Sequence, residues 1–442
     1  MSQGKPSPLS GFPEWLPTGQ LVERQIIDTM RRTFELHGFA PLSTRAVEPM
    51  DQLLRKGETS KEVYVLRRLQ ADADDASDSG LGLHFDLTVP FARYVLENSG
   101  KLQFPYRRYQ IQPCWRGERP QEGRYREFVQ ADIDIVDRDE LPFHYDVEIA
   151  LTAAEVLARL PLPAIRIRTN NRKVCQGFYQ GLGISDIDAA LRAVDKRDKI
   201  GPNGVAELLT TTAGATEAQA KACLALAEIS TDDSSFAERV AALGIGDPLL
   251  DEGVAELAAV VDTAREYNPG IVVADLSIAR GLDYYTGTVY EIAMEGVAGM
   301  SVGAGGRYDN LATAGSERYP GVGISLGVTR LLGLLFGKDA LTASRSVPTC
   351  VLVALPDEQS RRDCDRIAMG LRRRGIPTEV APAAQKYGKQ IRFAQRRGIP
   401  YVAFPGEDGV EIRDIRSGEQ APIDPAAWQP AEADRWPGIV TG

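Results

Sequence analysis

Polar and apolar residues alternate along two neighbouring stretches of the chain, and a period of two predicts β-strands. Residues 106–116 read YRRYQIQPCWR and place mostly polar side chains on one face: Arg108, Gln110, Gln112, Cys114 and Arg116. Residues 127–137 read EFVQADIDIVD, and one face collects Gln130, Asp132 and Asp134 beside Phe128. The segment between them, GERPQEGRYR, is rich in charge and turn residues. The pattern therefore predicts a hairpin of two strands joined by a long charged loop.

A helical period appears on both sides of this hairpin. Four apolar residues recur at i+4 near the N-terminus, namely Val22, Ile26, Met30 and Phe34, and Gly38 stands where such a helix would end. Residues 145–159 carry their apolar positions on one stripe, which predicts a further helix.

Four regions that differ in composition and in predicted secondary structure follow one another along the chain. Residues 1–168 and 270–340 mix strands with helices and are expected to form one core, which ends in the short apolar helix GVTRLLGLLF. Residues 169–269 are rich in Ala and Leu and are interpreted as a helical insertion. After the linker GKDALTASRSVP, residues 347–442 alternate strand and helix, which is typical of an α/β domain with a largely parallel sheet.

Composition narrows the class of protein. The 442 residues are 43% hydrophobic and 25% charged, as in a globular protein of two to four domains, with a net charge of −10. No apolar run approaches a membrane span, and five scattered cysteines without a C-x-x-C pair indicate free thiols, so we expect a cytoplasmic protein. Three histidines disfavour a His-rich metal site, and no metal-binding residue is predicted. No phosphate-binding glycine loop is present, so any bound ATP must be held by side chains.

The polar face of the hairpin has two possible explanations. A hairpin with one solvated face accounts for the alternation, but it accounts poorly for the choice of Arg116, Glu118, Gln130 and Asp134. Fixed acceptors beside guanidinium groups suit a zwitterionic small molecule next to a phosphate, which arginine binds through two parallel hydrogen bonds. From this hairpin alone the two explanations stay equal.

Residues 279–292, ARGLDYYTGTVYEI, place Arg280, Asp283 and two tyrosines directly before an alternating, strand-like segment. A salt-bridged turn that leads into a strand is the commoner explanation of such a sequence.

Several of these stretches together resemble one family. WRGERPQEGRYREF and GVGISLGVTRLLGLL resemble motifs 2 and 3 of class II aminoacyl-tRNA synthetases, and ARGLDYYTGTVYE with VGAGGRYDNL resembles the signature stretches of the histidyl-tRNA synthetase family. HFDLTVPFARY and GFPEWLP match it as well, and RTNNRKVCQGF is similar to its eukaryotic-type branch. The resemblance runs from about residue 11 to residue 420. It implies an α/β fold class in which an α+β catalytic core has the class II antiparallel sheet with flanking helices, followed by an α/β anticodon-binding domain.

The resemblance implies a role for each matching residue. Arg116 and Arg280 would be the catalytic cations at the α-phosphate of ATP, with Glu118 near the adenine amino group and Arg330 at the triphosphate tail. Arg280 would also reach the substrate carboxylate. The amino acid would be bound by Asp86 and Thr88 at its α-ammonium group and by four further residues: Gln130, Asp134, Tyr284 and Tyr285.

The implied reaction is the ligation of L-histidine to tRNA(His). The histidine carboxylate attacks the α-phosphorus of ATP to give histidyl-adenylate and pyrophosphate, with Mg²⁺ on the ATP phosphates, and a terminal ribose hydroxyl of tRNA then takes the histidyl group. A homodimer formed through motif 1, with Phe39 and Leu42 in its strand, is also implied. No membrane partner is expected.

Three positions depart from the family pattern. His84 stands where an arginine is usual, Thr329 replaces the glutamate before the motif 3 arginine, and Arg45 occupies the place of the motif 1 proline.

The C-terminal region is locally basic. Residues 358–400 hold eleven Lys and Arg against four Asp and Glu, a balance of +7 in a chain of net charge −10. Such clustering is a typical footprint of nucleic-acid binding, although solvated helix faces give the same composition.

Two alternatives remain from the sequence: a synthetase-like regulatory or histidine-binding paralogue that does not charge tRNA, and a class II synthetase for another amino acid or carrier. The retained RGLDYY stretch and C-terminal domain argue against the first of these.

Overall fold

The computed structural model describes residues 7–54, 62–68, 80–279, 281, 285–295, 301–337 and 340–442. These residues form two units. The first comprises the residues up to Pro13 together with Ile27–Gly333, and the second comprises Glu14–Ile26 together with Leu334–Gly442. Arg280, Asp283 and Tyr284 lie outside the described residues.

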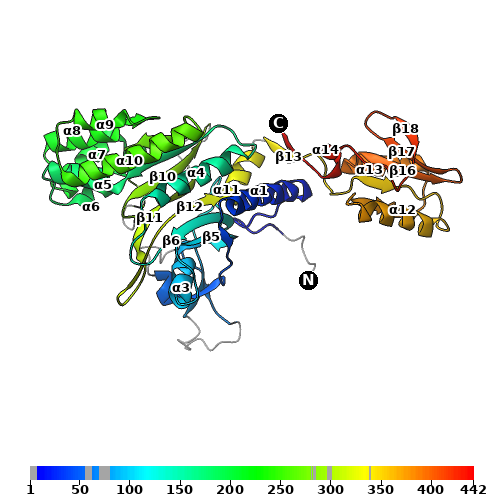
Figure 1. The fold of residues 1–442 in the computed structure, drawn as a ribbon, viewed down its shortest axis with the longest axis horizontal. Coiled ribbons are helices and arrows are strands. Elements are labelled where there is room, and N and C mark those ends of the chain that lie inside the picture. Colours follow the sequence, from blue (N-terminus) through cyan, green and yellow to red (C-terminus); the bar gives the residue numbers. More distant parts are fainter. Residues whose placement is uncertain are drawn as a thin grey trace. The chain divides into compact units, whose positions relative to one another are not determined.

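The first unit is built on a large mixed sheet (Figure 1). Its described strands follow the order β1-β5-β6-β12-β11-β10-β7-β9-β8. Their bounds are β1 (Ala40–Pro41), β5 (Tyr106–Trp115), β6 (Glu127–Val136), β12 (Glu317–Gly327), β11 (Ser301–Ala314), β10 (Thr288–Met294), β7 (Ile165–Asn171), β9 (Val272–Asp275) and β8 (Ser230–Thr231). The six strands from β5 to β7 pair antiparallel, which confirms the predicted class II sheet.

The predicted hairpin is β5–β6, and its register explains the polar pattern. Arg108 lies opposite Asp134, Gln110 opposite Asp132, and Gln112 opposite Gln130. Arg108 and Gln110 are fully buried, and Asp132 is 2% exposed. A solvated face is therefore the wrong explanation of the alternation, because this polar face is inside the protein.

Helices and a small sheet surround the large sheet. They are α1 (Pro17–Leu36), whose residues are divided between the two units, α2 (Met50–Leu53), α3 (Thr88–Asn98), α4 (His144–Ala158), and the sheet of β2 (Val47–Pro49), β4 (Leu81–Leu83) and β3 (Val65–Leu66). The predicted helices near 22–34 and 145–159 correspond to α1 and α4, and Gly38 beyond α1 adopts φ 76° as its predicted position requires.

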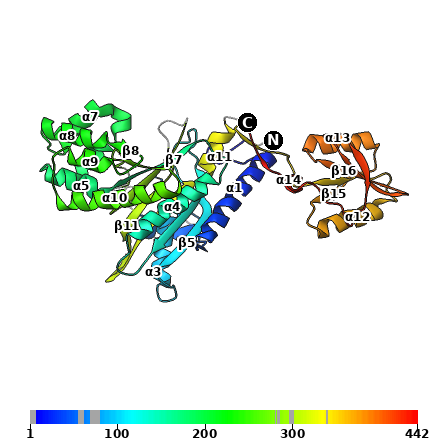
Figure 2. The same ribbon diagram turned by 45° about the horizontal axis from the view of Figure 1, so that its top comes forward.

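The insertion is mainly helical. Its helices are α5 (Arg172–Gly181), α6 (Ile187–Val194), α7 (Arg197–Thr212), α8 (Glu217–Ala227), α9 (Phe236–Ala241) and α10 (Pro248–Tyr267), drawn in green in Figure 1. Helices α10 and α4 pack side by side (Figure 2). The insertion also supplies β8 to the edge of the large sheet, which its Ala/Leu-rich composition did not reveal.

The second unit contains an α/β fold. Parallel pairing joins β15 (Thr378–Val380), β14 (Val351–Val353) and β16 (Tyr401–Gly406), and β17 (Gly409–Asp414) and β18 (Gln420–Ile423) continue the sheet antiparallel. Helices α12 (Arg361–Arg373) and α13 (Tyr387–Arg397) alternate with the parallel strands, as the sequence predicts. The unit also holds the end of α11 (Val328–Phe336), the short helix α14 (Glu432–Arg435), β13 (Leu341–Ala343) and β19 (Ile439–Thr441).

The predicted linker is partly a strand. Within GKDALTASRSVP, β13 pairs antiparallel with β19 at the end of the chain. A pairing across about one hundred residues leaves no local signal, so the linker interpretation was wrong at Leu341–Ala343. Among the described helices, none is long and apolar enough to cross a membrane.

Candidate active site

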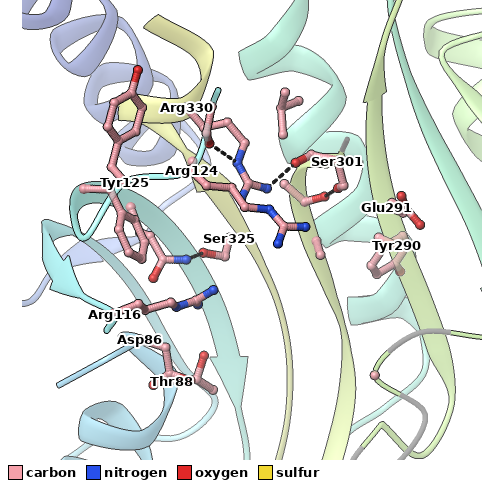
Figure 3. Close-up of a pocket in the computed structure, with 18 of the residues that line it drawn as sticks. Asp86, Thr88, Arg116, Arg124, Tyr125, Tyr290, Glu291, Ser301, Ser325 and Arg330 are labelled. Atoms are coloured by element: carbon pink, nitrogen blue, oxygen red, sulfur yellow. Dashed lines mark hydrogen bonds between the residues drawn. The ribbon is translucent and has the colours of Figure 1, made fainter. Parts of the chain in front are cut away.

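A cavity of about 340 Å³ is lined by residues of β6, β10, β11 and β12, of the β5–β6 loop and of the start of α3 (Figure 3). Most of the predicted site residues meet in it: Asp86, Thr88, Arg116, Glu118, Gln130, Tyr285 and Arg330. In Figure 3, Arg124 and Arg330 enter from one end, Asp86 and Thr88 lie toward the other, and Arg116 projects between them.

Arg116 directly follows β5 and is fixed by three contacts. Its backbone N–H donates to the Arg126 carbonyl oxygen at 2.9 Å, and its Nε donates to the Phe85 carbonyl oxygen at 3.0 Å. Its guanidinium lies 5.1 Å from the centre of the Phe128 ring. No carboxylate of the described residues pairs with it, so its charge is available to an anionic ligand.

Arg330 is held from α11 by two backbone carbonyls. Its Nε donates to Gly123 at 2.8 Å and its Nη1 donates to Ser301 at 2.6 Å. Burial lowers the pKa of Arg330, and the neighbouring guanidinium groups of Arg124 and Arg116 lower it further. Positive charges brought together at this cost favour an anion such as a phosphate.

Glu118 provides the acidic group at this end of the cavity. Its carboxylate lies 3.6 Å from Arg124, which is a loose ion pair between partly exposed side chains. Its backbone carbonyl accepts a hydrogen bond from Arg126 Nε at 3.2 Å and so helps to shape the loop.

Asp86 lies two residues before α3, the helix that Thr88 begins. The Asp86 carboxylate accepts a hydrogen bond from the Val89 N–H at 3.1 Å, and the residue is 5% exposed. A buried carboxylate at a cavity wall suits a cationic group of a ligand, because the pairing compensates its desolvation.

His84 links this segment to two others. Its buried ring lies between two backbone carbonyl oxygens, with Nδ1 3.2 Å from Arg45 and Nε2 2.7 Å from Pro113. A carbonyl oxygen only accepts hydrogen bonds, so the ring serves this place as an N–H donor. His84 thus occupies an arginine-like place as a structural donor two residues before Asp86.

The other two residues that depart from the family pattern, Thr329 and Arg45, also form hydrogen bonds or ion pairs within the protein. Thr329 Oγ1 accepts a hydrogen bond from the Val129 N–H at 2.8 Å, so a hydroxyl joins α11 to β6. Arg45 is half exposed and lies 3.2 Å from Glu48 and 3.5 Å from Glu97.

Gln130 lines the cavity with a fixed carboxamide. Its Nε2 donates to Ser325 Oγ at 2.7 Å, and this hydrogen bond is drawn in Figure 3. Ser325 in turn donates to Asp132. The Gln130 Oε1 atom is buried, and none of the described residues donates a hydrogen bond to it.

Asp132 lies beneath this pair. Burial raises its pKa to about 7, and the charges of Asp134 and Asp86 raise it too, while Arg108 and the Ser325 hydrogen bond lower it. The carboxyl group therefore ionises near neutral pH.

Asp134 is not among the residues that line the cavity. It is 4% exposed, and its carboxylate binds Arg108 Nη2 at 2.7 Å and accepts a hydrogen bond from Tyr308 Oη at 2.6 Å. The Arg108 guanidinium also lies over Phe91, 4.3 Å from the ring centre. The alternation placed Arg108 and Asp134 on the polar faces of their strands, but it predicted neither their cross-strand pairing nor the burial of the pair.

Tyr285 enters the cavity wall just before β10. Its N–H donates to the Gly281 carbonyl at 3.0 Å, and Gly281 adopts φ 70°, which favours glycine. Thr286 then donates its N–H to the Arg307 carbonyl at 2.8 Å. A Cβ atom on Gly306 would lie 2.8 Å from the Tyr285 ring, so a glycine is needed for the ring to pack there.

Arg124 and Ser325 are among the cavity residues that the sequence reasoning did not assign. Arg124 stood within the quoted EGRYR loop, whose basic residues were a usable signal. Ser325 stood in the quoted GISLG strand without any signal, because only the register with β6 places it beside Asp132.

Comparison with known proteins agrees with the motifs. A family model described as histidyl-tRNA synthetase matches residues 11–331, and one described as an anticodon binding domain matches residues 349–427. A protein of Cutibacterium acnes named histidine–tRNA ligase is 55% identical over 446 residues, or 98% of each chain. One of Micrococcus luteus with the same name is 54% identical over 448 residues and covers 98% of each chain.

A solved structure of histidyl-tRNA synthetase from a Nostoc species matches with a TM-score of 0.85 at 32% identity, over 95% of this chain and 97% of that one. The sheet, the arginine-lined cavity and these relatives agree, and the chain belongs to the histidyl-tRNA synthetase family.

Proposed function

We propose that this chain is a histidine–tRNA ligase, which activates L-histidine with ATP and transfers it to the 3′ end of tRNA(His). The observation that carries the proposal is the cavity itself. It joins the Arg116 and Arg330 guanidinium groups, which have no carboxylate partner among the described residues, to the buried carboxylate of Asp86 and to the Gln130 amide oxygen, which receives no hydrogen bond from those residues. Positive groups at one end of the cavity and hydrogen-bond acceptors at the other fit a triphosphate beside a zwitterionic amino acid.

In the first step the histidine carboxylate attacks the α-phosphorus, so no protein group has to act as a general base. Negative charge develops on the α-phosphate, and the fixed cation Arg116 stabilises it, with Arg280 as its proposed partner. Preorganised donors of this kind are worth ~10²–10³ in rate each.

The remainder of ATP is assigned to the same end of the cavity. Arg330 holds the triphosphate tail and Glu118 receives the adenine amino group. Mg²⁺ enters as part of the Mg·ATP substrate, and one or two carboxylates with substrate phosphates suffice to hold it. The described residues contain no cluster of three metal-ligating side chains, so in this proposal the phosphates provide most of its ligands.

Histidine is assigned to the opposite end. Asp86 and Thr88 bind the α-ammonium group, and Gln130, Tyr284 and Tyr285 surround the remainder. Asp134 does not line the cavity and is assigned a place behind this subsite, where Arg108 and Tyr308 bind its carboxylate.

The tRNA is assigned to α13. Several basic residues of the region are engaged locally: Arg361 with Glu358, Arg366 with Asp363, and Arg397 with Glu379. By contrast, Lys386, Lys389, Arg392 and Arg396 are exposed and have no ion pair within the described part of the chain. Spacings of three and four residues place Lys389, Arg392 and Arg396 on one face of α13, and Lys386 directly precedes the helix.

A homodimer is proposed through the motif 1 segment. The strand there is short, Ala40–Pro41, and forms the described edge of the large sheet, so Phe39 and Leu42 flank it rather than lie in it. Sedimentation at assay concentration tests this, since an active monomer would contradict it.

ATP–pyrophosphate exchange across the twenty amino acids, followed by charging of tRNA, tests the whole proposal. Exchange with histidine alone, together with charging, is expected. Exchange without charging would favour the paralogue, and exchange with another amino acid would favour a different synthetase.

A further inference from the structure

Among the described residues, a chain of two hydrogen bonds runs from the carboxamide of Gln130 through Ser325, which also lines the cavity, to Asp132 behind it. A serine hydroxyl has one proton. Because Ser325 gives that proton to Asp132, its oxygen can only accept from Gln130, and the Gln130 Nε2 at 2.7 Å is the donor. If the carboxamide rotated so that its oxygen and nitrogen exchanged places, this hydrogen bond would be lost.

The consequence is a fixed acceptor in the cavity wall. Gln130 Oε1 is buried and receives no hydrogen bond from the described residues. A buried acceptor without a partner carries a free-energy cost. A ligand that brings an N–H group to this oxygen recovers that cost, whereas a ligand that brings an acceptor is repelled.

We propose that Asp132 and Ser325 are positioning residues that lock Gln130 as an acceptor for an N–H group of the bound amino acid, either its ammonium group or its imidazole. This inference rests on the proposed function and adds to it. Asp132 and Ser325 act through Gln130 and are not catalytic residues.

Ser325 and Asp132 have different roles in holding the Gln130 carboxamide. Without the Ser325 hydroxyl, the amide loses its orienting acceptor. Without an acceptor at position 132, the hydroxyl is free to donate to Gln130 Oε1, which would occupy the oxygen and allow the amide to turn. Asp132→Asn retains an oxygen at the same place and should preserve the lock.

The test is calorimetric titration at pH 8, where the Asp132 carboxylate is ionised, with histidine, histidinol and imidazolepropionate. Ser325→Ala and Asp132→Ala should each weaken histidine binding roughly tenfold, the worth of one hydrogen bond. Asp132→Asn should stay within about threefold, and ATP affinity should be unchanged in both Asp132 variants, because Asp132 does not line the cavity. Ser325→Ala added to Gln130→Ala should cause no further loss, because the lock acts only through Gln130.

Histidinol keeps both N–H donors, and imidazolepropionate lacks the ammonium group. A loss in Ser325→Ala that persists with imidazolepropionate assigns the imidazole as donor, and a loss confined to histidine and histidinol assigns the ammonium group. Unchanged histidine affinity in a folded Ser325→Ala variant, or additive losses in the double variant, would overturn the lock. A wild-type protein that binds no histidine would instead overturn the proposed function itself.

Discussion

The cavity and helix α13 both present cationic side chains, but in opposite surroundings. Arg116 and Arg330 are partly buried and fixed by backbone carbonyls, and neither has a carboxylate partner among the described residues. Lys389, Arg392 and Arg396 are exposed on one helix face. Fixed charge in a desolvated site acts strongly over a few ångströms, whereas exposed charge acts over longer distances and is screened by salt. The two regions are thus suited to different tasks, one to a single phosphate and the other to a polyanion.

The largest expected effect is the loss of Arg116. Arg116→Ala should reduce ATP–pyrophosphate exchange by ~10²–10³, since it removes a preorganised cation from the developing charge. Arg280→Ala should have an effect of similar size. The control is Lys389→Ala, whose exchange should equal that of the wild type. Near-normal exchange in a folded Arg116→Ala variant would remove this residue from the catalytic role.

The second effect concerns tRNA. The triple variant Lys389→Gln, Arg392→Gln and Arg396→Gln should weaken tRNA binding roughly 10–100-fold and flatten its salt dependence by about two to three units of log–log slope. Exchange should be unaffected. The control, Arg361→Gln with Arg366→Gln, removes cations that are already paired with Glu358 and Asp363 and should change binding much less. Equal losses in both variants would show that α13 has no special role.

These substitutions are preferable to removing the region beyond residue 345. No candidate catalytic residue lies beyond Arg330, so a truncated chain should still activate histidine. However, truncation there would also remove β19, which pairs with β13, and the Pro437 carbonyl, which accepts a hydrogen bond from the Gln25 side chain. A loss of activity could then reflect damage to the fold of the remaining chain.

The third effect is a pH dependence of stability that has opposite signs at Asp132, behind the cavity, and at Glu358, just before α12 in the basic region. Burial raises the pKa of Asp132 from 3.8 to about 7, so between these values the folded protein binds a proton that the unfolded chain has released. This contribution to stability is present at low pH and is lost as the pH rises toward 7. Asp132→Asn should therefore be more favourable to stability, relative to wild type, at pH 8 than at pH 5.

Just before α12 the sign reverses. The hydrogen bond from Arg361 lowers the pKa of Glu358, so the contribution of this carboxylate to the stability of the fold is present at neutral pH and is lost on acidification. Glu358→Gln should cost stability slightly at pH 7 and less at pH 4. Urea denaturation at these pH values measures both variants. An Asp132→Asn effect that is equal at pH 5 and pH 8 would contradict the raised pKa.

The smallest effect comes from packing behind the loop that carries Arg124. A Cβ atom on Gly333 would lie 2.0 Å from Tyr125 Oη, so Gly333→Ala must displace the Tyr125 ring from the cavity wall. We expect KM for ATP to rise roughly threefold to tenfold. Adding Tyr125→Phe removes the closest atom and should restore part of the affinity, while Tyr125→Phe alone serves as the control. A KM equal to wild type in Gly333→Ala would mean that the loop is not held through this contact.

The sequence predicted local structure well where the spacing of polar and apolar residues alone identifies a strand or a helix. Alternation placed β5 and β6 with Arg108, Gln110 and Gln112 on one face, and the resemblance brought Asp86, Arg116 and Arg330 into one site. It could not predict which polar face would be buried, because both a solvated and an enclosed face alternate in the same way. Ser325 and β13 were missed for a related reason. Each depends on a partner strand whose register is set by tertiary packing.

The second unit has a consequence for the order of synthesis. It combines Glu14–Ile26 with the chain beyond Leu334, and it closes only when β19, Ile439–Thr441, pairs with β13. Its first piece leaves the ribosome more than four hundred residues before its last. At about 5–20 residues per second, that piece waits roughly 20–90 s for its partners. Val22 and Ile26, fully buried in the finished protein, are exposed or held by other surfaces during that interval. The segment is therefore the place where a chaperone would have the longest time to bind.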